Sequence, residues 1–473
     1  MTPFIEFLTM THGRSRDLSS VATVSPSTVG RTALVSVALG SLMVALDVTA
    51  LNVALPSIGH AFEVGIDRLQ WIASAYTLMF ASLLLASGSA SDRLGARGTF
   101  VAGLIVFMAA SIACGSAAGI VVLIAARAAQ GLGAAIMLPS SMALLATAYP
   151  DPARRSGAIA LWGGISAVGL VAGPIVGGLL CELTGWRAIF YLNAPFCLVA
   201  IGAALRCDER HAEHVRAFDP CGVVLSAVAL ASITFALIEA PMRGWHAPLI
   251  VTTMTVAVVA AVALVTVERH VAEPMLPPQL FASPAFSASV GVAFLQTFAY
   301  YGTLFVLPVA LQMHGVDPLT VGLQLAPMTV TTGVAATLSG RLSKAFGMRR
   351  MMTLGMLSGA VGALVSCTFG VTQGTFVLTA LLLGMGGATL PLIVASALAE
   401  VSSHRAGIAS GVVNAARQSG GVLGIACLGA LMNNGRADAR PALLVIAVAF
   451  FGAAALSFAR LHHPARAAAC TKS

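Results

Sequence analysis

Charged residues are scarce in this chain. Asp, Glu, Lys and Arg together make up 9% of its 473 residues, whereas 58% are hydrophobic. Soluble domains carry about a quarter charged residues, so this composition excludes a protein that folds in water. Apolar runs of about 20 residues, the length that crosses a hydrocarbon core about 30 Å thick, recur along the whole sequence with short polar breaks between them. We therefore expect an all-α integral membrane protein without a soluble domain.

Patterns typical of enzymes and metal sites are also missing. The eight cysteines are scattered, and none belongs to a CxxC pair or to a Cys/His cluster with metal-ligand spacing. No nucleophile and base stand in a pattern typical of catalysis. The net charge of +8 does not indicate nucleic acid, because the basic residues lie in short loops rather than on one face or in one tail. We expect neither an enzyme nor a metal, cofactor or nucleic-acid site.

The apolar windows predict fourteen transmembrane helices. They cover residues 33–55, 70–90, 99–117, 120–145, 158–180, 188–205, 221–239, 249–266, 285–308, 320–338, 351–369, 374–397, 407–431 and 441–459. The polar residues 1–32 are predicted to be a disordered cytoplasmic tail, and residues 460–473 a second cytoplasmic tail. If the amino terminus is cytoplasmic, the tails and loops on that side hold 19 Lys and Arg residues and the opposite side holds five. This bias predicts that both termini are cytoplasmic.

An internal repeat supports a two-part architecture. The loop after the second helix contains Gly88 and Gly95, and the loop after the tenth contains Gly340 and Gly347, so both glycine pairs are spaced by seven. Two copies at equivalent places indicate two related halves. We expect an N-terminal six-helix bundle at 33–205, a linker with two inserted transmembrane helices at 206–284, and a C-terminal six-helix bundle at 285–459.

Two charges deep in the predicted helices are the strongest candidates for a functional site. Asp47 lies about 12 Å from the outer end of the first helix, and Arg127 lies about 10 Å from the outer end of the fourth, so the two can meet. An Asp inside a membrane is costly, about 2.5 to 3.5 kcal/mol on insertion scales, and the neutral acid is its less costly form. Asp47 is therefore a plausible proton carrier, with Arg127 holding it deprotonated. A permanent structural ion pair is the alternative.

Further candidates lie on other predicted helices. The fifth helix carries Gly169, Gly173, Pro174, Gly177 and Gly178, whose spacing allows close helix packing with a bendable point. Ordinary packing explains such a run equally well. Candidate cavity residues are Asn52, Gln130, Arg417, Phe294, Phe298 and Tyr301. Arg417 has no obvious acidic partner in the sequence, and the aromatic residues fit packing better than binding.

Together these motifs resemble the major facilitator superfamily, specifically its fourteen-helix branch of drug:proton antiporters. The loop signature after helix 2 is matched by Gly88, Asp92, Arg93, Gly95 and Arg97, and the helix 4 signature by Arg127, Gln130, Gly131 and Gly133. The helix 5 antiporter signature is matched by Gly173, Pro174, Gly177 and Gly178, and the helix 1 signature by Asp47, Thr49, Asn52, Ala54, Leu55 and Pro56. Ala90 and Ala160 depart from the family pattern.

The resemblance implies roles for these residues. Asp47 would couple proton entry to substrate exit with support from Arg127, Asp92 and Arg93 would latch a cytoplasmic gate, and the helix 5 run would pack the two halves together. The expected function is proton-driven export of amphipathic or cationic organic compounds across a bacterial inner membrane. Its partners would be the small-molecule substrate, protons and the lipid bilayer. Two alternatives remain open: a dedicated exporter of one metabolite or antibiotic, and a non-transporting membrane receptor.

Overall fold

The computed structural model describes residues 28–207, 219–271, 274, 276–370, 373–401, 405–432 and 438–460. Regular structure in these residues is entirely helical. The helices are α2 (Thr28–Phe62), α3 (Ile66–Leu94), α4 (Ala96–Gly115), α5 (Ile120–Ala148), α6 (Pro152–Leu183), α7 (Arg187–Ala204), α8 (Pro220–Arg243), α9 (Pro248–Glu268), the short 3-10 helix η2 (Pro278–Ala282), α10 (Pro284–Met313), α11 (Pro318–Phe346), α12 (Met348–Phe369), α13 (Gln373–Gly387), α14 (Leu390–Ala399), α15 (Ala406–Met432) and α16 (Arg440–Arg460).

Local sequence explains where several helices begin and end. Asp151 precedes α6 and Asp317 precedes α11, and each carboxylate accepts a hydrogen bond from a backbone N–H of the first turn while a proline follows directly. Gly95 joins α3 to α4 with φ of 92°, and Gly347 joins α11 to α12 with φ of 86°. Side chains disfavour such positive φ values, so the repeated loops need glycine at these two positions.

Twelve helical segments are long and apolar enough to cross a membrane, with α13 and α14 contributing one segment together. Helices α3 and α15 are not among the twelve, although they have 29 and 27 residues. Both carry polar side chains in their middle turns, and they pack against each other at the centre of the molecule. The count of fourteen crossings therefore stays a prediction.

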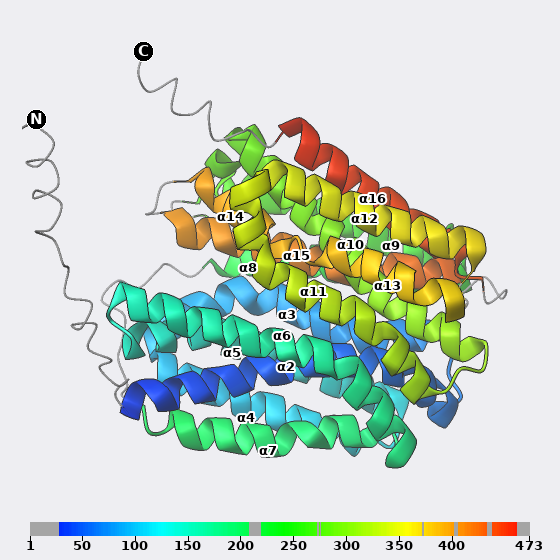
Figure 1. Cartoon of the computed structure of the whole chain (residues 1–473), viewed down its shortest axis with the longest axis horizontal. Helices are drawn as coiled ribbons and strands as arrows, with labels where there is room; N and C mark the ends of the chain where they lie inside the picture. Colours follow the sequence, from blue (N-terminus) through cyan, green and yellow to red (C-terminus); the bar gives the residue numbers. More distant parts are fainter. Residues whose placement is uncertain are drawn as a thin grey trace, which may run out of the picture.

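The helices form two groups that lie side by side (Figure 1). Helices α2 to α7 make the first half and α10 to α16 the second, and the pairs α3–α15 and α6–α11 join them. Helix α8 packs against α3 and α15, and α9 packs against α8. The N-terminal end of α2 and the C-terminal end of α16 lie at the same end of the bundle.

The two ends of the bundle differ in charge. Most of the described Lys and Arg residues near helix ends lie at the end that holds the start of α2, which we call the basic end. The other end, the opposite end, holds Arg68, Arg187, Arg243 and Arg440. This distribution agrees with the positive-inside bias and predicts that the basic end faces the cytoplasm.

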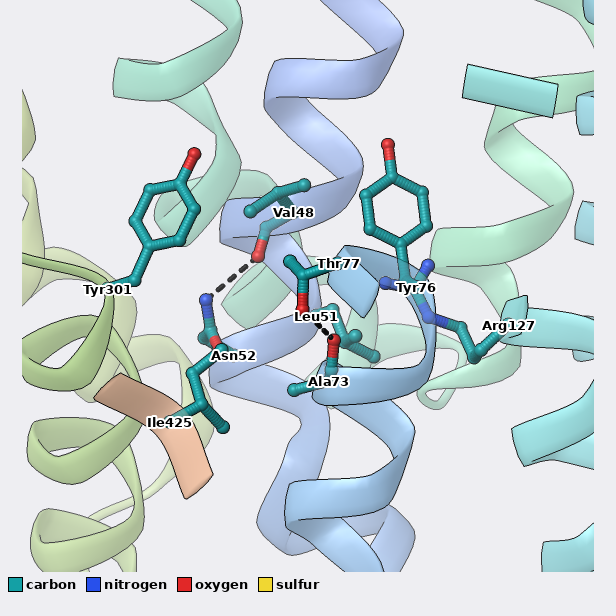
Figure 2. A pocket seen from close by; sticks show the side chains of 9 residues that line it. All are labelled: Val48, Leu51, Asn52, Ala73, Tyr76, Thr77, Arg127, Tyr301 and Ile425. Atoms are coloured by element: carbon teal, nitrogen blue, oxygen red, sulfur yellow. Dashed lines mark hydrogen bonds between the residues drawn. The ribbon is translucent and has the colours of Figure 1, made fainter. Parts of the chain in front are cut away.

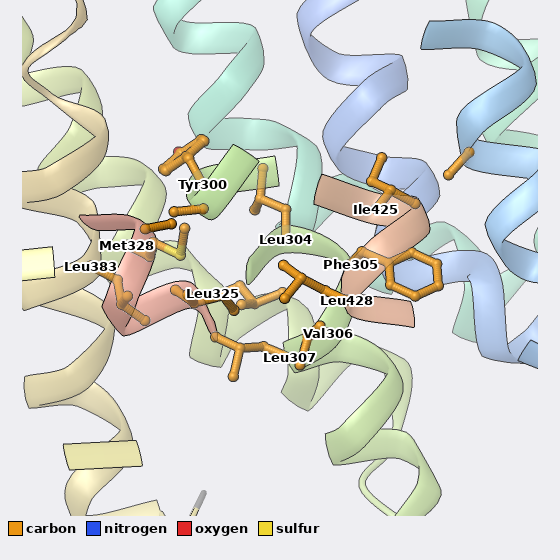
Figure 3. Close-up of a cluster of buried hydrophobic side chains, with 14 of the residues drawn as sticks. Tyr300, Leu304, Phe305, Val306, Leu307, Leu325, Met328, Leu383, Ile425 and Leu428 are labelled. Atoms are coloured by element: carbon orange, nitrogen blue, oxygen red, sulfur yellow. The ribbon is translucent and has the colours of Figure 1, made fainter. Parts of the chain in front are cut away.

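The buried cores show how the halves are joined. One large cluster includes Leu55 and Ile58 of α2 in the first half together with Leu304 of α10 and Ile425 of α15 in the second. Figure 3 shows the second-half part of this cluster, where side chains from α10, α11, α13 and α15 interdigitate. A separate cluster around Phe100 takes all its buried residues from the basic-end portion of the first half, between residues 33 and 207. The described halves thus share a core toward the opposite end but not at the basic end of the first half.

Candidate functional site

The structure places Asp47 of α2 and Arg127 of α5 in direct contact, as their matching depths predict. Nη1 of Arg127 lies 2.6 Å from Oδ2 of Asp47, and the two side chains are 1% and 0% exposed. A buried pair of opposite charges keeps both groups ionised only if the remaining donors and acceptors are also satisfied.

Two amide side chains complete the hydrogen bonds of this carboxylate, and one serine bonds both amides. Oδ1 of Asp47 accepts hydrogen bonds from the amides of Gln130 at 2.9 Å and Asn193 at 3.0 Å. Both amides also donate to the hydroxyl of Ser111, which itself donates to the backbone carbonyl of Phe190. The carboxylate therefore accepts hydrogen bonds from three donors, two on α5 and one on α7.

Sequence reasoning missed Ser111 and Asn193. Each is an isolated polar residue within an apolar helix, α4 and α7 respectively, and neither belongs to a motif singled out in the sequence. Their polarity is the only feature that marks these two residues in the sequence, and many membrane helices contain isolated polar residues. Tertiary packing is needed to show that both face the same carboxylate.

Arg127 has contacts beyond the carboxylate. Its Nη1 donates to Oε1 of Gln130 at 2.6 Å, and its Nε donates to the backbone carbonyl of Ile72 at 3.3 Å. The guanidinium also lies over the ring of Tyr76, 4.4 Å from the centroid. These contacts hold the guanidinium in place independently of Asp47.

A small cavity lies beside the ion pair and between the two halves (Figure 2). Its lining residues are Val48, Leu51, Asn52, Ala73, Tyr76, Thr77, Arg127, Tyr301 and Ile425. Its volume is about 10 Å³, near the minimum that holds one water molecule. The hydroxyls of Tyr76 and Tyr301 point toward the same side, that of Val48 rather than Asn52. Because α2 starts at the basic end, this side is the one nearer the basic end.

The predicted cavity residues occupy different places. Asn52 and Tyr301 line the cavity, whereas Gln130 belongs to the ion-pair network. Phe294 and Phe298 stack with ring centroids 6.3 Å apart, and they do not line this cavity. At Gly420 and Gly424 of α15, an added Cβ would meet the backbones of Phe294 and Phe298 respectively. These two aromatic residues thus lie at the tight contact between α10 and α15, in agreement with packing.

The glycine and proline run of α6 contacts both halves. An added Cβ on Gly169 would lie 2.5 Å from the carbonyl oxygen of Leu42, and one on Gly177 would lie 2.7 Å from that of Ala50. Gly173 faces Thr49 in the same way. Three glycines of α6 thus leave the space into which α2, the helix that carries Asp47, packs. On another face, an added Cβ at Gly178 would lie 2.6 Å from the carbonyl oxygen of Pro318 in α11, and Gly322 of α11 meets Pro174.

The residues of the predicted cytoplasmic gate lie at the basic end. Gly88 and Arg93 belong to the last turns of α3, Arg93 is exposed, and Gly95 forms the turn into α4. Nη1 of Arg97 donates to the backbone carbonyl of Cys207 at 2.9 Å, which ties α4 to the end of α7 within the first half. The side chain of Asp92 lies outside what the structure describes. A latch between the halves stays a prediction.

Two glutamines join the halves toward the opposite end. The amide of Gln70 in α3 donates to the carbonyls of Ile425 at 3.0 Å and Ala426 at 2.7 Å in α15. The amide of Gln312, at the end of α10, donates to the carbonyl of Val53 in α2 at 2.8 Å. These bonds and the shared core close the opposite end in this conformation.

Helix α8 is anchored next to the site. Glu239 is 6% exposed, and it accepts a hydrogen bond from Nε1 of Trp71 in α3 at 3.2 Å and pairs with Arg243 at 2.8 Å. The rings of Trp71 and Phe235 pack 6.0 Å apart. Trp71 follows Gln70 directly in α3, so α8 contacts α3 close to the place where the two halves meet.

The sequence matches the family model described as "Major Facilitator Superfamily" over residues 37–425, and in a second alignment over 289–470. The "Methylenomycin A resistance protein" of Streptomyces coelicolor is 35% identical over 415 residues, which cover 86% of each chain. The "Multidrug resistance protein Stp" of Mycobacterium tuberculosis is 34% identical over 403 residues, 84% of this chain and 75% of the relative. The "Tetracenomycin C resistance and export protein" of Streptomyces glaucescens is 35% identical over 418 residues, 86% of this chain and 77% of the relative.

Solved structures show the same fold. A crystal structure of a POT family transporter in complex with a thioalcohol conjugated peptide aligns with a TM-score of 0.68, covering 89% of this chain and 94% of that one. Sequence identity is 12%, so this likeness concerns the fold alone.

Proposed function

Because the chain belongs to the major facilitator superfamily, we propose that this multi-pass membrane transporter exports small amphipathic organic compounds in exchange for protons. The single observation that carries the proposal is the buried pair of Asp47 and Arg127, held by Gln130 and Asn193 beside a cavity between the halves. The resistance and export functions in the names of its relatives support the direction of transport and a drug-like substrate. Their bacterial origin supports a place in a bacterial inner membrane.

The proton step follows from the chemistry of the site. Protonation of Asp47 removes its charge and turns one carboxylate oxygen from an acceptor into a donor, so it cannot keep its contacts with Arg127, Gln130 and Asn193 unchanged. Arg127 keeps its charge through Gln130 and the face of Tyr76. Protonation therefore loosens α2 from α5 and α7.

Loosening α2 acts on the contact between the halves. Asp47 lies on the stretch of α2 that packs into Gly169, Gly173 and Gly177, and α6 in turn packs into α11 of the second half. A shift of α2 is thus passed to the contact between α6 and α11. Rocking of one bundle against the other about a central site is the motion expected of two such halves.

The closed opposite end gives this conformation a place in the cycle. If the basic end faces the cytoplasm, as charge placement predicts, the halves are joined on the outer side and the state is closed to the outside. In this proposal the units are the bundles at 33–205 and 285–459, with the inserted pair between them, both termini are cytoplasmic, and Asp92 and Arg93 latch the cytoplasmic side once it closes.

Transport into proteoliposomes tests the proposal. Purified protein is reconstituted, a proton gradient is imposed, and uphill movement of cationic, neutral and acidic dyes is followed for wild type, Asp47→Asn and Asp151→Asn. We expect coupled movement in wild type and in Asp151→Asn, because Asn also caps helix α6 well. Asp47→Asn should lose uphill movement but retain exchange of substrate down its gradient.

Each contrary result has a defined meaning. Unaltered uphill transport by Asp47→Asn would remove Asp47 from coupling. A wild-type protein that moves neither dyes nor protons across the whole panel would favour a receptor. Transport restricted to a single compound would favour the dedicated exporter.

A further inference from the structure

Arg417 is a charged side chain in the middle of α15 that the proton step does not use. Its Nη1 donates to Oδ1 of Asn414 at 2.8 Å, whereas its Nε is buried and has no hydrogen-bond partner among the described residues. No described carboxylate lies within 4.0 Å of it. An Arg cannot discard its charge, and inside a membrane such a group is expected to have a partner or to face a site.

Helix geometry places Arg417 on the face of α15 that points to the cavity. Residues four and eight positions apart share one helix face, and Ile425, eight positions later, lines the cavity. Gly421 lies between them, and an added Cβ there would lie 2.5 Å from Cδ2 of Tyr301, another lining residue. At 1.5 Å per residue, Arg417 is about 12 Å from Ile425 toward the basic end.

The neighbouring helices do not supply a counter-ion at this level. Neither α10 nor α15 contains an acidic residue, and Asp47 of α2 is already bound to Arg127. Gln70 of α3 lies level with Ile425, and Asp92 follows 22 positions later, about 33 Å along the helix. The backbone of Asp92 therefore lies about 20 Å beyond the level of Arg417.

Two phenol hydroxyls of the cavity point in the same direction. The hydroxyl of Tyr76 is buried without a hydrogen-bond partner among the described residues, and Figure 2 shows it and the hydroxyl of Tyr301 pointing to the side of Val48. Arg417 lies on this side of Ile425. A guanidinium at this level and two phenol hydroxyls that point toward the same end of the bundle match a group that accepts hydrogen bonds and carries negative charge.

From these positions we propose that Arg417 binds an acidic group of the exported compound, so that the substrates include amphipathic organic acids or zwitterions. This proposal rests on the proposed export function and replaces the expected preference for cations. A carboxylate would contact the guanidinium of Arg417. The apolar body of the same molecule would lie toward Tyr301 and Ile425 after the halves move apart, because the cavity between them holds about one water molecule in this conformation.

Equilibrium binding to the full chain tests the acidic-group proposal without requiring transport. The probes are dansylglycine, which carries a carboxylate, and dansylglycine amide, its neutral match, with the protein in phosphatidylcholine nanodiscs. We expect wild type to prefer the acid and Arg417→Gln to weaken acid binding by roughly 10- to 100-fold, the range for hydrogen bonds to a charged group, with the amide unchanged. Arg417→Lys should keep part of the preference. Arg405→Gln removes the same charge from the start of α15 and should leave both affinities unchanged.

Three results would overturn the proposal: equal affinity of wild type for acid and amide, an acid preference that survives Arg417→Gln, and loss of acid binding when phosphatidylglycerol is added. The last would assign Arg417 to a lipid headgroup. Failure of uphill transport together with an Arg417-dependent acid preference would reject the export function while retaining the anion site.

Discussion

Asn193 donates a hydrogen bond to Asp47 at 3.0 Å, although 146 residues separate them in the chain. Gln130 donates to the same oxygen, Oδ1, while Arg127 binds the other. The two amides therefore hold the carboxylate in position beside Arg127. Loss of either amide should loosen the contact between α2 and the helix that carries it.

Replacing Asn193 should weaken proton-coupled transport. We expect Asn193→Ala to lower the initial rate of uphill transport several-fold, because the carboxylate of Asp47 loses a hydrogen bond, worth about 1 kcal/mol, that positions it beside Arg127. The measurement is the initial transport rate in proteoliposomes with an imposed proton gradient. In Asp47→Asn, adding Asn193→Ala should cause no further loss of uphill transport. An unchanged rate in the single variant would contradict the role given to Asn193.

Replacing Arg127 should destabilise the fold. Arg127→Gln leaves the Asp47 carboxylate buried without its cation, and breaking a buried pair in this way costs about 3 to 5 kcal/mol. Thermal unfolding in detergent should show a marked fall in Tm. Combining Arg127→Gln with Asp47→Asn removes the unpaired charge and should restore much of the lost stability. If the double variant were as unstable as the single one, packing of Arg127 rather than its charge would explain the result.

The contact between α6 and α2 should not tolerate a larger residue. Gly177→Val places side-chain atoms where the carbonyl oxygen of Ala50 lies, so α2 and α6 must separate. We expect strongly reduced transport, measured per folded molecule after size-exclusion chromatography. Gly163→Ala is the matched control on the same helix, because nothing lies within 4 Å of its added Cβ. Equal activity of both variants would show that the α6 glycines are not needed for close packing.

Gln70 should hold the opposite end closed. Gln70→Leu removes two hydrogen bonds to α15, worth roughly 1 kcal/mol each, so the population open at this end should rise roughly tenfold or more. Spin labels at Ala61→Cys and His314→Cys, in a cysteine-free background, report the distance between the halves there. In Gln70→Leu we expect the distance distribution between the two labels to contain a component at longer distance. This component should be weak in the protein with native Gln70. An unchanged distribution would show that the shared core alone closes this end.

Much of the architecture could be predicted from sequence because it depends on local properties. Apolar length and loop charge predict helices and their orientation, and the two glycine pairs predict related halves. Depth along a helix even predicted the meeting of Asp47 and Arg127, because position in a bilayer restricts which residues lie at one level. The membrane supplies this restriction, which a soluble fold lacks.

Other parts of the site could not be predicted in this way. The sequence does not distinguish Asn193 and Ser111 from isolated polar residues that face other helices. Helix α15 satisfies the length of a crossing, but polar residues in its middle turns, Arg417 and Gln418 among them, lower its apolar signal. Phe294 and Phe298 lie at a tight helix contact instead of lining the cavity beside the ion pair.

The sequence by itself determined that this chain belongs in a membrane, that charges at Asp47 and Arg127 share one depth, and that Arg417 lacks an obvious partner. Tertiary structure alone decided that Asn193 and Gln130 share one carboxylate oxygen, that the halves join at the opposite end, and that Arg417 shares a helix face with a cavity-lining residue. The physical reason is that hydropathy and charge act residue by residue, whereas these contacts depend on how helices distant in the chain rotate and pack against one another.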